Sequence, residues 1–292
     1  MPRRTQSRAM ALFRRLGFDR IAWSLRRLHC PVERDALVLE VGSGGNPYYR
    51  ANVLLDAFED TRQRHWAKLV ADRPTVIGVV ENLPFRDKAF DFVIASHVLE
   101  HSADPARFLS ELERVAKAGY IEVPDALMER LNPYMDHRLE ITVRDSRLVI
   151  RKKRGWRQDE ELAELYEQRA APVIGERTIP RHPFEFHVRY YWHNSIPHVV
   201  VNPEVDASWP APPAPDQPLT RTVRGAIQGV VLHVLRFLLS QRGRNRSIDL
   251  VALLRCPACH AESVSASGTT LRCEACGERY EIKDGIPRFA RN

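Results

Sequence analysis

The chain has no long hydrophobic run and only five cysteines among its 292 residues. No apolar stretch approaches the roughly 20 residues that a membrane-spanning helix needs, so a transmembrane protein is not expected. The first residues are rich in arginine but carry no apolar core, which argues against a secretory signal. Four cysteines form two Cys-x-x-Cys pairs near the C-terminus, which is typical of metal binding rather than of a disulfide framework. These features predict a reducing, cytoplasmic location.

Basic residues outnumber acidic residues in the chain. The 44 Lys and Arg against 37 Asp and Glu give a formal net charge of +7. Such a charge suits a polyanionic partner such as RNA. It also reflects a bias towards arginine, because lysine is rare in this sequence. Net charge indicates non-specific affinity rather than function, so both interpretations stay open.

Two segments have the periodicity of amphipathic helices. In residues 7–29 and again in residues 221–239, apolar side chains recur at spacings that share one broad face. Packing against a neighbouring domain is the simplest interpretation of both helices. The alternative for residues 7–29 is contact with RNA or with an anionic membrane surface, and for residues 221–239 it is peripheral membrane binding.

Short apolar runs alternate with helical patterns between residues 31 and 123. This alternation predicts an α/β fold with a Rossmann-like, doubly wound and mostly parallel sheet. Strands are expected at 37–41, 53–55, 76–80, 90–95 and 120–123, and helices at 62–71 and 105–116.

Polar residues and a Gly-rich turn follow the ends of the predicted strands. Glycine lets the backbone turn sharply and approach a ligand closely. An acid that ends the second strand, here Asp56, is suited to hold a ribose diol. Ligands of parallel sheets bind beyond the carboxyl ends of the strands, so these residues predict a ligand site. The candidates are Glu40, Gly42, Ser43, Gly44, Gly45, Asp56, Glu81 and Ser96.

The order and spacing of Leu37–Asn46, Asp56, Glu81–Phe85 and Phe90–His101 resemble class I S-adenosylmethionine-dependent methyltransferases, in particular the type 11 family. The resemblance covers about residues 37–123. It implies S-adenosyl-L-methionine as the cofactor, with the Gly-rich turn facing its amino-acid portion and Glu40 helping to hold its ammonium group. It also implies that Asp56 accepts hydrogen bonds from both ribose hydroxyls.

The resemblance places Glu81, Asn82 and Leu83 beside the adenine, and the sequence departs from the family near this position. Val79 stands where the family usually has an acid for the adenine amine, and Asn46 stands where it usually has a glycine. Glu81 or a backbone carbonyl is a substitute acceptor for the amine. The short gap between the turn and Asp56 predicts a truncated first helix.

His97 is a weak candidate for a catalytic base, because it follows the fourth strand, where the acceptor site is expected. A base is needed only if the nucleophile carries a proton at the working pH. His101 more often caps or packs the following helix in this family. Residues after the fifth strand are candidates to line the acceptor pocket, with loop polarity as the equal alternative. They are Glu122, Asp125, Tyr134 and His137.

The segment beyond residue 123 carries weaker signals. A β-hairpin is predicted at 138–152, a polar helix at 159–170, and the last strand or strands of the sheet at 185–201. The aromatic residues of the last segment suit strand packing, with an aromatic wall for a substrate base as the alternative. The prolines of residues 206–222 predict an extended linker.

The C-terminal segment has the spacing of a zinc ribbon. Two Cys-x-x-Cys pairs lie about a dozen residues apart. Four thiolates complete a tetrahedral site, so the predicted zinc is structural and contributes most of the folding energy of this small segment. The expected ligands are Cys256, Cys259, Cys273 and Cys276.

The sequences Leu253–Cys259 and Tyr280–Pro287 resemble the small zinc-ribbon activator subunit of tRNA, rRNA and release-factor methyltransferases. That subunit normally binds its enzyme as a separate chain, whereas the resemblance here implies a fusion. The sequence thus predicts an S-adenosylmethionine-dependent methyltransferase of unknown acceptor (RNA, protein or small molecule), with a ribbon that stabilises the catalytic domain or helps to bind substrate. The alternatives are a catalytically degenerate scaffold and a nucleic-acid-binding ribbon protein. A nicotinamide dinucleotide-binding domain is disfavoured, because the turn lacks G-x-G-x-x-G.

The expected boundaries are 1–30 for the basic helix, 31–205 for the cofactor domain, 206–222 for the linker, 223–246 for the connecting helix and 247–292 for the ribbon.

Overall fold

The computed structural model describes residues 5–59, 68–157, 159–211 and 223–289. The chain divides into two compact units, each built from three segments. The first unit comprises Met1–Pro31, Ala95–Leu109 and Tyr120–Ala214. The second unit comprises Val32–Ile94, Ser110–Gly119 and Pro215–Asn292.

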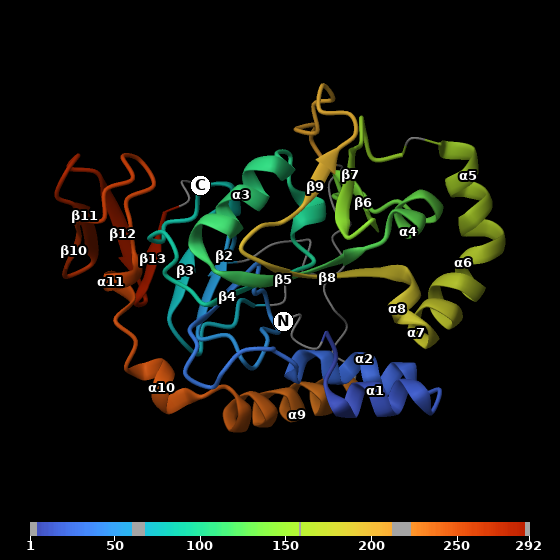
Figure 1. Cartoon of the computed structure of the whole chain (residues 1–292), viewed down its shortest axis with the longest axis horizontal. Helices are drawn as coiled ribbons and strands as arrows, with labels where there is room; N and C mark the ends of the chain where they lie inside the picture. Colours follow the sequence, from blue (N-terminus) through green and yellow to red (C-terminus); the bar gives the residue numbers. More distant parts are fainter. Residues whose placement is uncertain (1–4, 60–67, 158, 212–222, 290–292) are drawn as a thin grey trace. The chain divides into compact units, whose positions relative to one another are not determined.

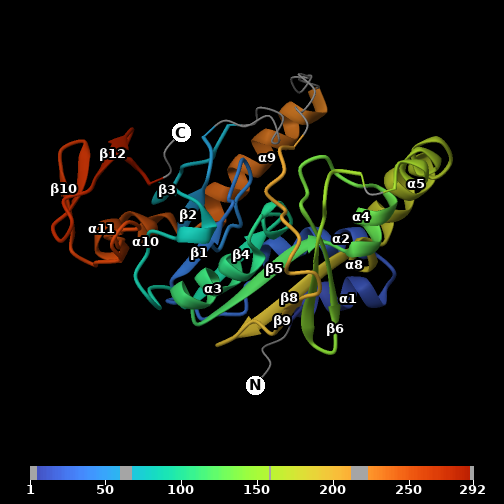
Figure 2. The same ribbon diagram turned by 90° about the horizontal axis from the view of Figure 1, so that it is seen from above.

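The second unit is built on a parallel sheet of short, buried strands. Its first strands are β1 (Val38–Val41), β2 (Val53–Asp56) and β3 (Thr75–Ile77), and they lie side by side in Figure 2. Leu39 is opposite Val53 and Leu54 is opposite Thr75, both in parallel register. All residues of the three strands are buried, as expected for strands covered on both faces. The parallel α/β fold predicted from the sequence is therefore confirmed.

The C-terminal strands extend this sheet. They form an antiparallel ladder whose last strand pairs in parallel with β3, where Arg288 is opposite Ile77. Phe289 N–H also donates to the carbonyl of Ile77 at 2.8 Å. Figure 1 shows the last strand beside β3, so the order in this unit is β10-β11-β12-β13-β3-β2-β1-β4. The added strands are β10 (Val264–Ser267), β11 (Thr270–Cys273), β12 (Arg279–Lys283) and β13 (Ile286–Arg288).

Three helices precede these strands, α9 (Val223–Leu239), α10 (Arg242–Arg246) and α11 (Leu250–Leu253). The buried Asn245 on α10 accepts a hydrogen bond from Asn52 Nδ2 at 2.8 Å, and Asn52 Oδ1 accepts from Val38 N–H at 3.0 Å. A buried amide pair needs such complete partnering. It therefore fixes α10 against the start of the parallel sheet.

Three elements are shared between the units along the chain. They are β4 (Phe92–Ser96), α3 (Pro105–Val115) and β5 (Ala118–Pro124). The strands predicted at 90–95 and 120–123 and the helix predicted at 105–116 are confirmed with small shifts of their ends. The strand expected at 76–80 ends at Ile77, and residues Val80–Asn82 form a 3-10 turn instead. The helix expected at 62–71 falls largely outside the described residues.

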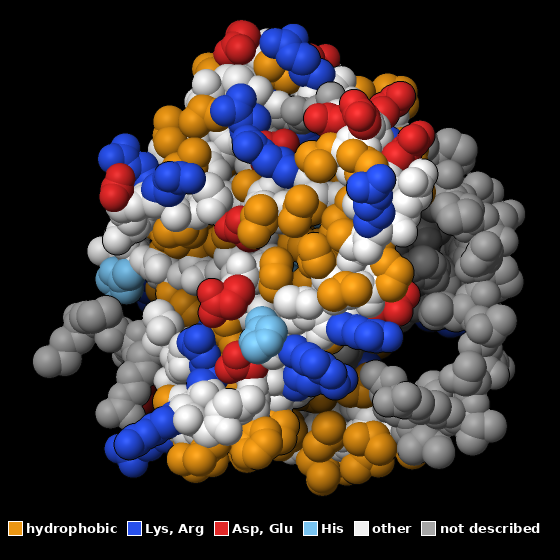
Figure 3. All heavy atoms as spheres, turned by 90° about the vertical axis from the view of Figure 1, so that its right-hand side faces the viewer, with side chains coloured by type: hydrophobic (Ala, Val, Ile, Leu, Met, Phe, Trp, Pro, Cys, Tyr) orange, Lys and Arg blue, Asp and Glu red, His pale blue; other side chains and the backbone are white. Residues whose placement is uncertain are grey.

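The first unit begins with two helices rather than the single helix predicted at 7–29. They are α1 (Arg8–Arg15) and α2 (Asp19–Leu25), followed by a 3-10 turn. Gly17 separates them with a φ of +78°, which glycine adopts readily and other residues rarely do. The prediction of a single helix was wrong because it relied on the apolar periodicity and did not take account of Gly17. Apolar side chains gather along the lower edge of the face in Figure 3. On α1, Leu12 and Leu16 are exposed.

Strand β8 (His187–His193) follows β4 and β5 in the sheet order of this unit. A separate three-stranded sheet contains β6 (Leu139–Arg144), β7 (Arg147–Lys152) and β9 (His198–Val200). The hairpin predicted at 138–152 is confirmed, with Asp145 and Ser146 in its turn at φ +49° and +60°. The segment 185–201 was expected in the main sheet, but β9 pairs with β7 in parallel register.

A helical arm connects the two sheets of this unit. It contains α4 (Ala126–Leu131), α5 (Glu160–Leu165), α6 (Ala171–Val173), α7 (Ile179–Arg181) and α8 (Pro183–Phe186), with π-helical turns on either side of α6. Asp159 is the N-cap of α5, so the helix begins where the sequence predicted. The helical conformation continues past the expected end at residue 170. Of the expected linker, only residues 206–211 are described; the carbonyls of Ala207 and Trp209 accept hydrogen bonds from Arg138.

Within the described ranges, no helix has both the length and the apolar character needed to cross a membrane.

Candidate functional site

The Gly-rich turn begins where β1 ends. Gly42 and Gly44 have φ angles of +64° and +57°, in the left-handed region that favours glycine. Ser43 N–H donates to the carbonyl of Leu55 at 3.2 Å, and Val70 N–H donates to the carbonyl of Gly44 at 3.0 Å. The turn is therefore held on two sides by its own unit, and its conformation is already set.

Asp56, the acid at the end of β2, is bonded to this turn. Its Oδ2 accepts from Gly44 N–H at 2.9 Å, and its Oδ1 accepts from Phe58 N–H at 3.0 Å. Glu40 is buried, and its Oε2 accepts from Tyr48 N–H at 2.7 Å. The structure thus brings together Glu40, the turn and Asp56, which the sequence predicted as parts of one site.

Ser43 has a buried hydroxyl oxygen with no hydrogen-bond partner among the described residues. A buried polar atom of this kind usually has a partner, and its absence calls for an explanation. A bound molecule that supplies a donor or acceptor at the Gly-rich turn is the simplest one. The turn therefore has the backbone shape and an available polar group that a small polar ligand requires.

The segment predicted to border the adenine has a different environment. Val79 is 42% exposed. Asn82 Nδ2 donates to the carbonyl of Pro257, in the C-terminal segment, at 3.2 Å. Leu83 is buried, its N–H donates to Glu111 Oε2 at 2.7 Å, and its carbonyl accepts from Arg114 Nη2 at 2.9 Å. The backbone of this segment is thus occupied by α3 on one side.

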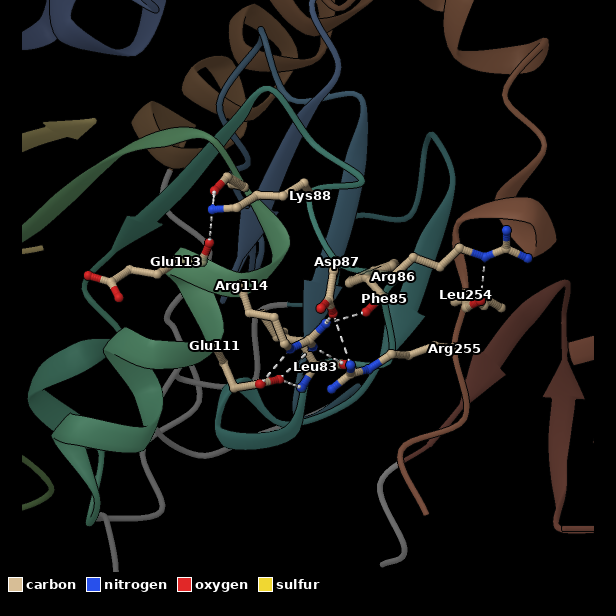
Figure 4. Close-up of polar contacts among 11 residues, drawn as sticks. Leu83, Phe85, Arg86, Asp87, Lys88, Glu111, Glu113, Arg114, Leu254 and Arg255 are labelled. Carbon is tan, nitrogen blue, oxygen red and sulfur yellow. Dashed lines mark hydrogen bonds and ion pairs between the residues drawn. The ribbon is translucent and has the colours of Figure 1, made fainter. Parts of the chain in front are cut away.

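Arg114 is the centre of a polar network that holds residues 83–87 (Figure 4). It donates to both carboxylate oxygens of Glu111 at 2.6 and 2.7 Å and to the carbonyl of Phe85 at 2.7 Å. Its Nη1 also lies 2.9 Å from Asp87 Oδ1, which contacts Arg255 Nη1 at the same distance. Burial alone would lower the pKa of Arg114, but the carboxylates of Glu111 and Asp87 outweigh this effect and raise it.

The C-terminal segment contacts the same loop through its backbone. Arg86 N–H donates to the carbonyl of Leu253 at 2.9 Å, and Arg255 N–H donates to the carbonyl of Pro84 at 3.1 Å. Phe85 and Leu254, both completely buried, form an antiparallel bridge at this point. The loop is therefore fixed between α3 and the segment that leads into the cysteines.

The four cysteines predicted to bind zinc lie together. Their sulfur atoms are within 4.8 Å of one another. Cys256 Sγ lies 3.8 Å from Cys276 Sγ, and Cys259 Sγ lies 3.5 Å from Cys273 Sγ. A tetrahedral zinc with bonds of 2.3 Å places its sulfur ligands about 3.8 Å apart. The four side chains thus fit a structural zinc ion with little movement.

In the first unit, His97 lies between two buried carboxylates. Its Nδ1 is 3.3 Å from Glu100 Oε1, and its Nε2 is 3.5 Å from Glu122 Oε1. The two carboxylates are almost completely buried, whereas the His97 ring is 41% exposed. Burial favours the neutral ring, but the carboxylates outweigh it and raise the pKa of His97 to about 9. Glu100 is buried, and the same contacts lower its pKa to about 2.

Glu122 is surrounded by donors from distant parts of the sequence. Arg26 Nε lies 2.8 Å from it, Ser96 Oγ donates to it at 3.1 Å, and Tyr120 OH also donates to it. Burial would raise the pKa of Glu122, but His97 and Arg26 lower it. The carboxylate is therefore ionised at neutral pH.

Glu122 and His97 were both candidates from the sequence, but the sequence showed no partners that would orient the His97 ring. Those partners come from Glu100, three residues away, and from Glu122 on another strand; Arg26 is 96 residues from Glu122. The Glu100–His97 spacing was visible on the sequence, whereas the contact with Arg26 had no local signal. Asp125 caps α4, where its Oδ1 accepts from Leu127 N–H at 2.9 Å.

Two hollows lie over the three-stranded sheet of the first unit. Their volumes are about 360 and 250 Å³, and both are lined by Arg130, Glu140 and Arg151. Glu140 Oε2 lies 3.0 Å from Arg130 Nε and 3.9 Å from Arg151 Nε, so the acid offsets part of their charge. Asp125 lines the larger hollow, while His97 and Glu122 line neither.

Residues 39–121 match a family model described as "Methyltransferase domain". This part of the chain is similar to methyltransferase domains, as the resemblance of its motifs implied. A curated relative, "Uncharacterized protein MJ1123" of Methanocaldococcus jannaschii, is 30% identical over 93 residues. That match covers 31% of this chain, and the chain spans 43% of the length of the relative.

Several solved structures are similar at low identity. A complex between the Haloferax volcanii Trm112 methyltransferase activator and a methyltransferase is 17% identical, with 64% of this chain and 96% of that chain covered and a TM-score of 0.36. An S-adenosylmethionine-dependent methyltransferase from Mesorhizobium loti is 11% identical, with 60% and 97% covered and a TM-score of 0.34. One from Aquifex aeolicus is 20% identical, with 40% and 73% covered and a TM-score of 0.28. The similarity to a methyltransferase family therefore rests on residues 39–121.

The raised pKa of His97 predicts a pH dependence of stability. Its ordinary pKa is 6.5 and its folded value is about 9, so the folded state binds the proton more tightly. This contribution to stability is complete below pH 6.5 and is lost as the pH rises through 9. We expect the difference in urea midpoint between the wild type and His97→Gln to shrink from pH 6 to pH 10, and a ring resonance that titrates near 9 in histidine NMR spectra. The exposed His193→Gln serves as the control; a His97 resonance that titrates near its ordinary value would contradict the prediction.

The Arg114 network predicts a large loss of stability on truncation. Arg114→Ala leaves the Glu111 carboxylate and two loop carbonyls without their donor, which costs about 3 kcal/mol. Lys117→Ala removes an exposed ion pair with Asp91 and is expected to cost below about 1 kcal/mol. Urea unfolding measures both values. Equal effects of the two substitutions would show that Arg114 has no special role in holding the loop.

Proposed function

We propose that the chain is an S-adenosylmethionine-dependent methyltransferase whose zinc ribbon, fused in the same chain, stabilises the cofactor domain. The observation that carries this proposal is the hydrogen bond between Asp56 and Gly44 N–H, at the carboxyl ends of two neighbouring parallel strands. It lies within the segment that matches a methyltransferase domain. An acid at this position beside a Gly-rich turn is suited to a cofactor that carries a ribose.

The turn and Asp56 would hold the cofactor. The positive φ angles of Gly42 and Gly44 support close approach of the amino-acid portion, and the buried Ser43 hydroxyl supports a polar contact there. The cofactor supplies an electrophilic methyl group when bound. Glu40, Gly45, Glu81, Asn82, Leu83 and Ser96 stay predictions as further cofactor contacts. The Asn82 amide and the Leu83 backbone already have hydrogen-bond partners within the protein. The Leu83 side chain is therefore the main group of these two residues that could contact the adenine.

His97 would act on the acceptor as a cation rather than as a base. A ring that keeps its proton to about pH 9 donates hydrogen bonds at neutral pH and does not remove a proton. Glu100 and Glu122 hold the ring from two sides, and its exposed edge is accessible to another molecule. The contact with RNA stays a prediction from the net charge of +7.

The ribbon would act by fixing the loop that the family places beside the adenine. Asn82, Pro84 and Arg86 each have a hydrogen bond to residues 253–257, directly before and within the first cysteine knuckle. A structural zinc ion that orders this knuckle therefore also orders the loop. The ribbon need not touch the substrate to support catalysis in this arrangement.

A catalytically degenerate scaffold is the second candidate function. The exposed Val79, at the position of the family's adenine-binding acid, favours it. Cofactor affinity separates the two candidates.

We expect zinc-loaded protein to bind S-adenosylmethionine and S-adenosylhomocysteine with micromolar affinity in calorimetric titrations. Asp56→Ala removes two charged hydrogen bonds to the ribose, each worth about 1.5–3 kcal/mol, so the affinity should fall by at least about 100-fold. The matched control is Asp35→Ala, at an exposed acid of the same unit. No binding by folded wild-type protein would leave the scaffold as the function.

Zinc analysis tests the role of the cysteines. After gel filtration, Cys273→Ser should contain one zinc ion per chain fewer than the wild type, because three thiolates bind the ion weakly. The loss should also expose the loop at residues 82–86 to faster amide hydrogen exchange, since its partners at 253–257 lose their order. Cys30→Ser, outside the four-cysteine group, is the control. Unchanged zinc content in Cys273→Ser would refute a four-cysteine site.

A further inference from the structure

The first unit contains a second group of metal-ligating side chains that the proposed methyl transfer does not use. Glu100, His101 and His137 each offer one ligand atom, and these atoms lie within 4.8 Å of one another. We propose that these three residues form a binding site for a divalent transition metal such as Zn²⁺, separate from the four cysteines. Imidazole and carboxylate ligands together suit such ions.

Two segments of the chain build the group. Glu100 and His101 lie on the 3-10 turn Leu99–His101 after β4, and His137 lies just before β6. Arg138 N–H donates to the carbonyl of Glu100 at 2.7 Å, which fixes the two segments together. The rings of His101 and His137 have centroids 4.8 Å apart and stand nearly perpendicular, at 87°. They are therefore near neighbours that are not stacked face to face.

Both histidines have the outer contacts that metal-bound imidazoles usually make. His137 Nδ1 lies 2.5 Å from Glu129 Oε1, and His101 Nδ1 lies 3.3 Å from the carbonyl of Asp136. A ligand histidine commonly donates its second ring N–H to a carboxylate or a carbonyl, which fixes the ring and its tautomer. Here these contacts use Nδ1 in both rings and leave Nε2 for a metal. Glu129 is itself held by the buried Lys153 at 3.2 Å.

The surroundings of the Glu100 carboxylate give a second reason to expect a cation at this position. Its side chain is 1% exposed, and neither carboxylate oxygen has a hydrogen-bond partner among the described residues. The contact with His97 Nδ1 at 3.3 Å is an ion pair without the direction of a hydrogen bond. Without a metal, the ion pair with His97 and the nearby rings of His101 and His137 offset the cost of burying this carboxylate. A divalent cation bound directly to these oxygens would compensate that cost.

The distances suit a metal after a small adjustment. A tetrahedral ion at 2.0–2.2 Å from nitrogen and oxygen ligands places those ligands about 3.4 Å apart. Three protein ligands leave a fourth position for water or another molecule, which is the pattern of catalytic rather than structural zinc sites. The side chain of His101 is 35% exposed, so an outside ligand can reach this position. The site is therefore accessible without opening the fold.

The metal-free alternative is an ion network in which His137 carries a proton. Burial lowers the pKa of His137, but Glu129, Glu100 and Asp136 raise it overall. The charged or titratable groups that face this ring are Glu100, His101, Glu129, Tyr134 and Asp136. A metal would replace the proton on His137, and its affinity would then fall at low pH.

Metal content and affinity of the full-length protein decide between these states. Chains loaded with Zn²⁺ and freed of excess metal by gel filtration should hold two equivalents by mass spectrometry, one in the cysteines. Glu100→Gln and His137→Gln should each hold one, as should Cys273→Ser, while His193→Gln should hold two. The double variant His137→Gln, Cys273→Ser should hold none. A wild-type content of one equivalent that only the cysteine substitution removes would overturn the proposal.

A second measurement covers loss of folding in the buried variants. His101→Gln changes a partly exposed side chain, so it is expected to fold as the wild type does by circular dichroism. Calorimetric titration of Zn²⁺ into protein with the ribbon already loaded should show one further site, weakened at least tenfold by His101→Gln. Cobalt in that site should give the visible absorption of nitrogen and oxygen ligands without the thiolate-to-cobalt band. Absence of further binding by the wild type would refute the site, whatever the state of the buried variants.

Discussion

The partly buried guanidinium of Arg114 is the interaction on which the second unit depends most. It binds the carbonyls of Leu83 and Phe85 and both oxygens of Glu111, and so ties the loop after β3 to α3. A planar guanidinium presents its donors in a fixed fork, which is why one side chain can hold several acceptors at once. Phe85 also forms a bridge with Leu254, and its neighbours Pro84 and Arg86 have hydrogen bonds to Arg255 and Leu253. The loop thus links the parallel sheet, α3 and the cysteine-bearing segment into one structure.

The first unit depends on a different constraint, the presence of two buried carboxylates close to several histidines. Glu122 is compensated by Arg26, Ser96, Tyr120 and His97, so its charge is stable inside the protein. Among the residues that the structure describes, Glu100 has the His97 ion pair and the neighbouring rings of His101 and His137. Both acids raise the pKa of His97, and the different surroundings of Glu100 motivate the proposed second metal site.

The features that the sequence predicted are those with a local physical cause. Continuous apolar runs predicted β1 and β2, the glycines and Asp56 predicted the turn, and the Cys-x-x-Cys spacing predicted the four-sulfur group. The periodicity of residues 7–29 could not show the break at Gly17, where one backbone angle outweighs the repeat of apolar side chains. The pairing of β9 with β7 and the contact of Arg26 with Glu122 join distant segments, so no local pattern encodes them. Glu100, His101 and His137 are residue types that often bind metals, but the sequence could not show that they lie together. Their proximity depends on the placement of the loop before β6.

The central claim is that Asp56 and the turn at Gly42–Gly45 hold an adenosyl cofactor. A crystal structure of the zinc-loaded chain grown with S-adenosylhomocysteine tests it most directly. The account predicts both ribose hydroxyls within hydrogen-bonding distance of the Asp56 carboxylate and the amino-acid portion against the turn. Crystals grown at saturating ligand that show no density at this turn, or ligand density elsewhere on the chain, would contradict it.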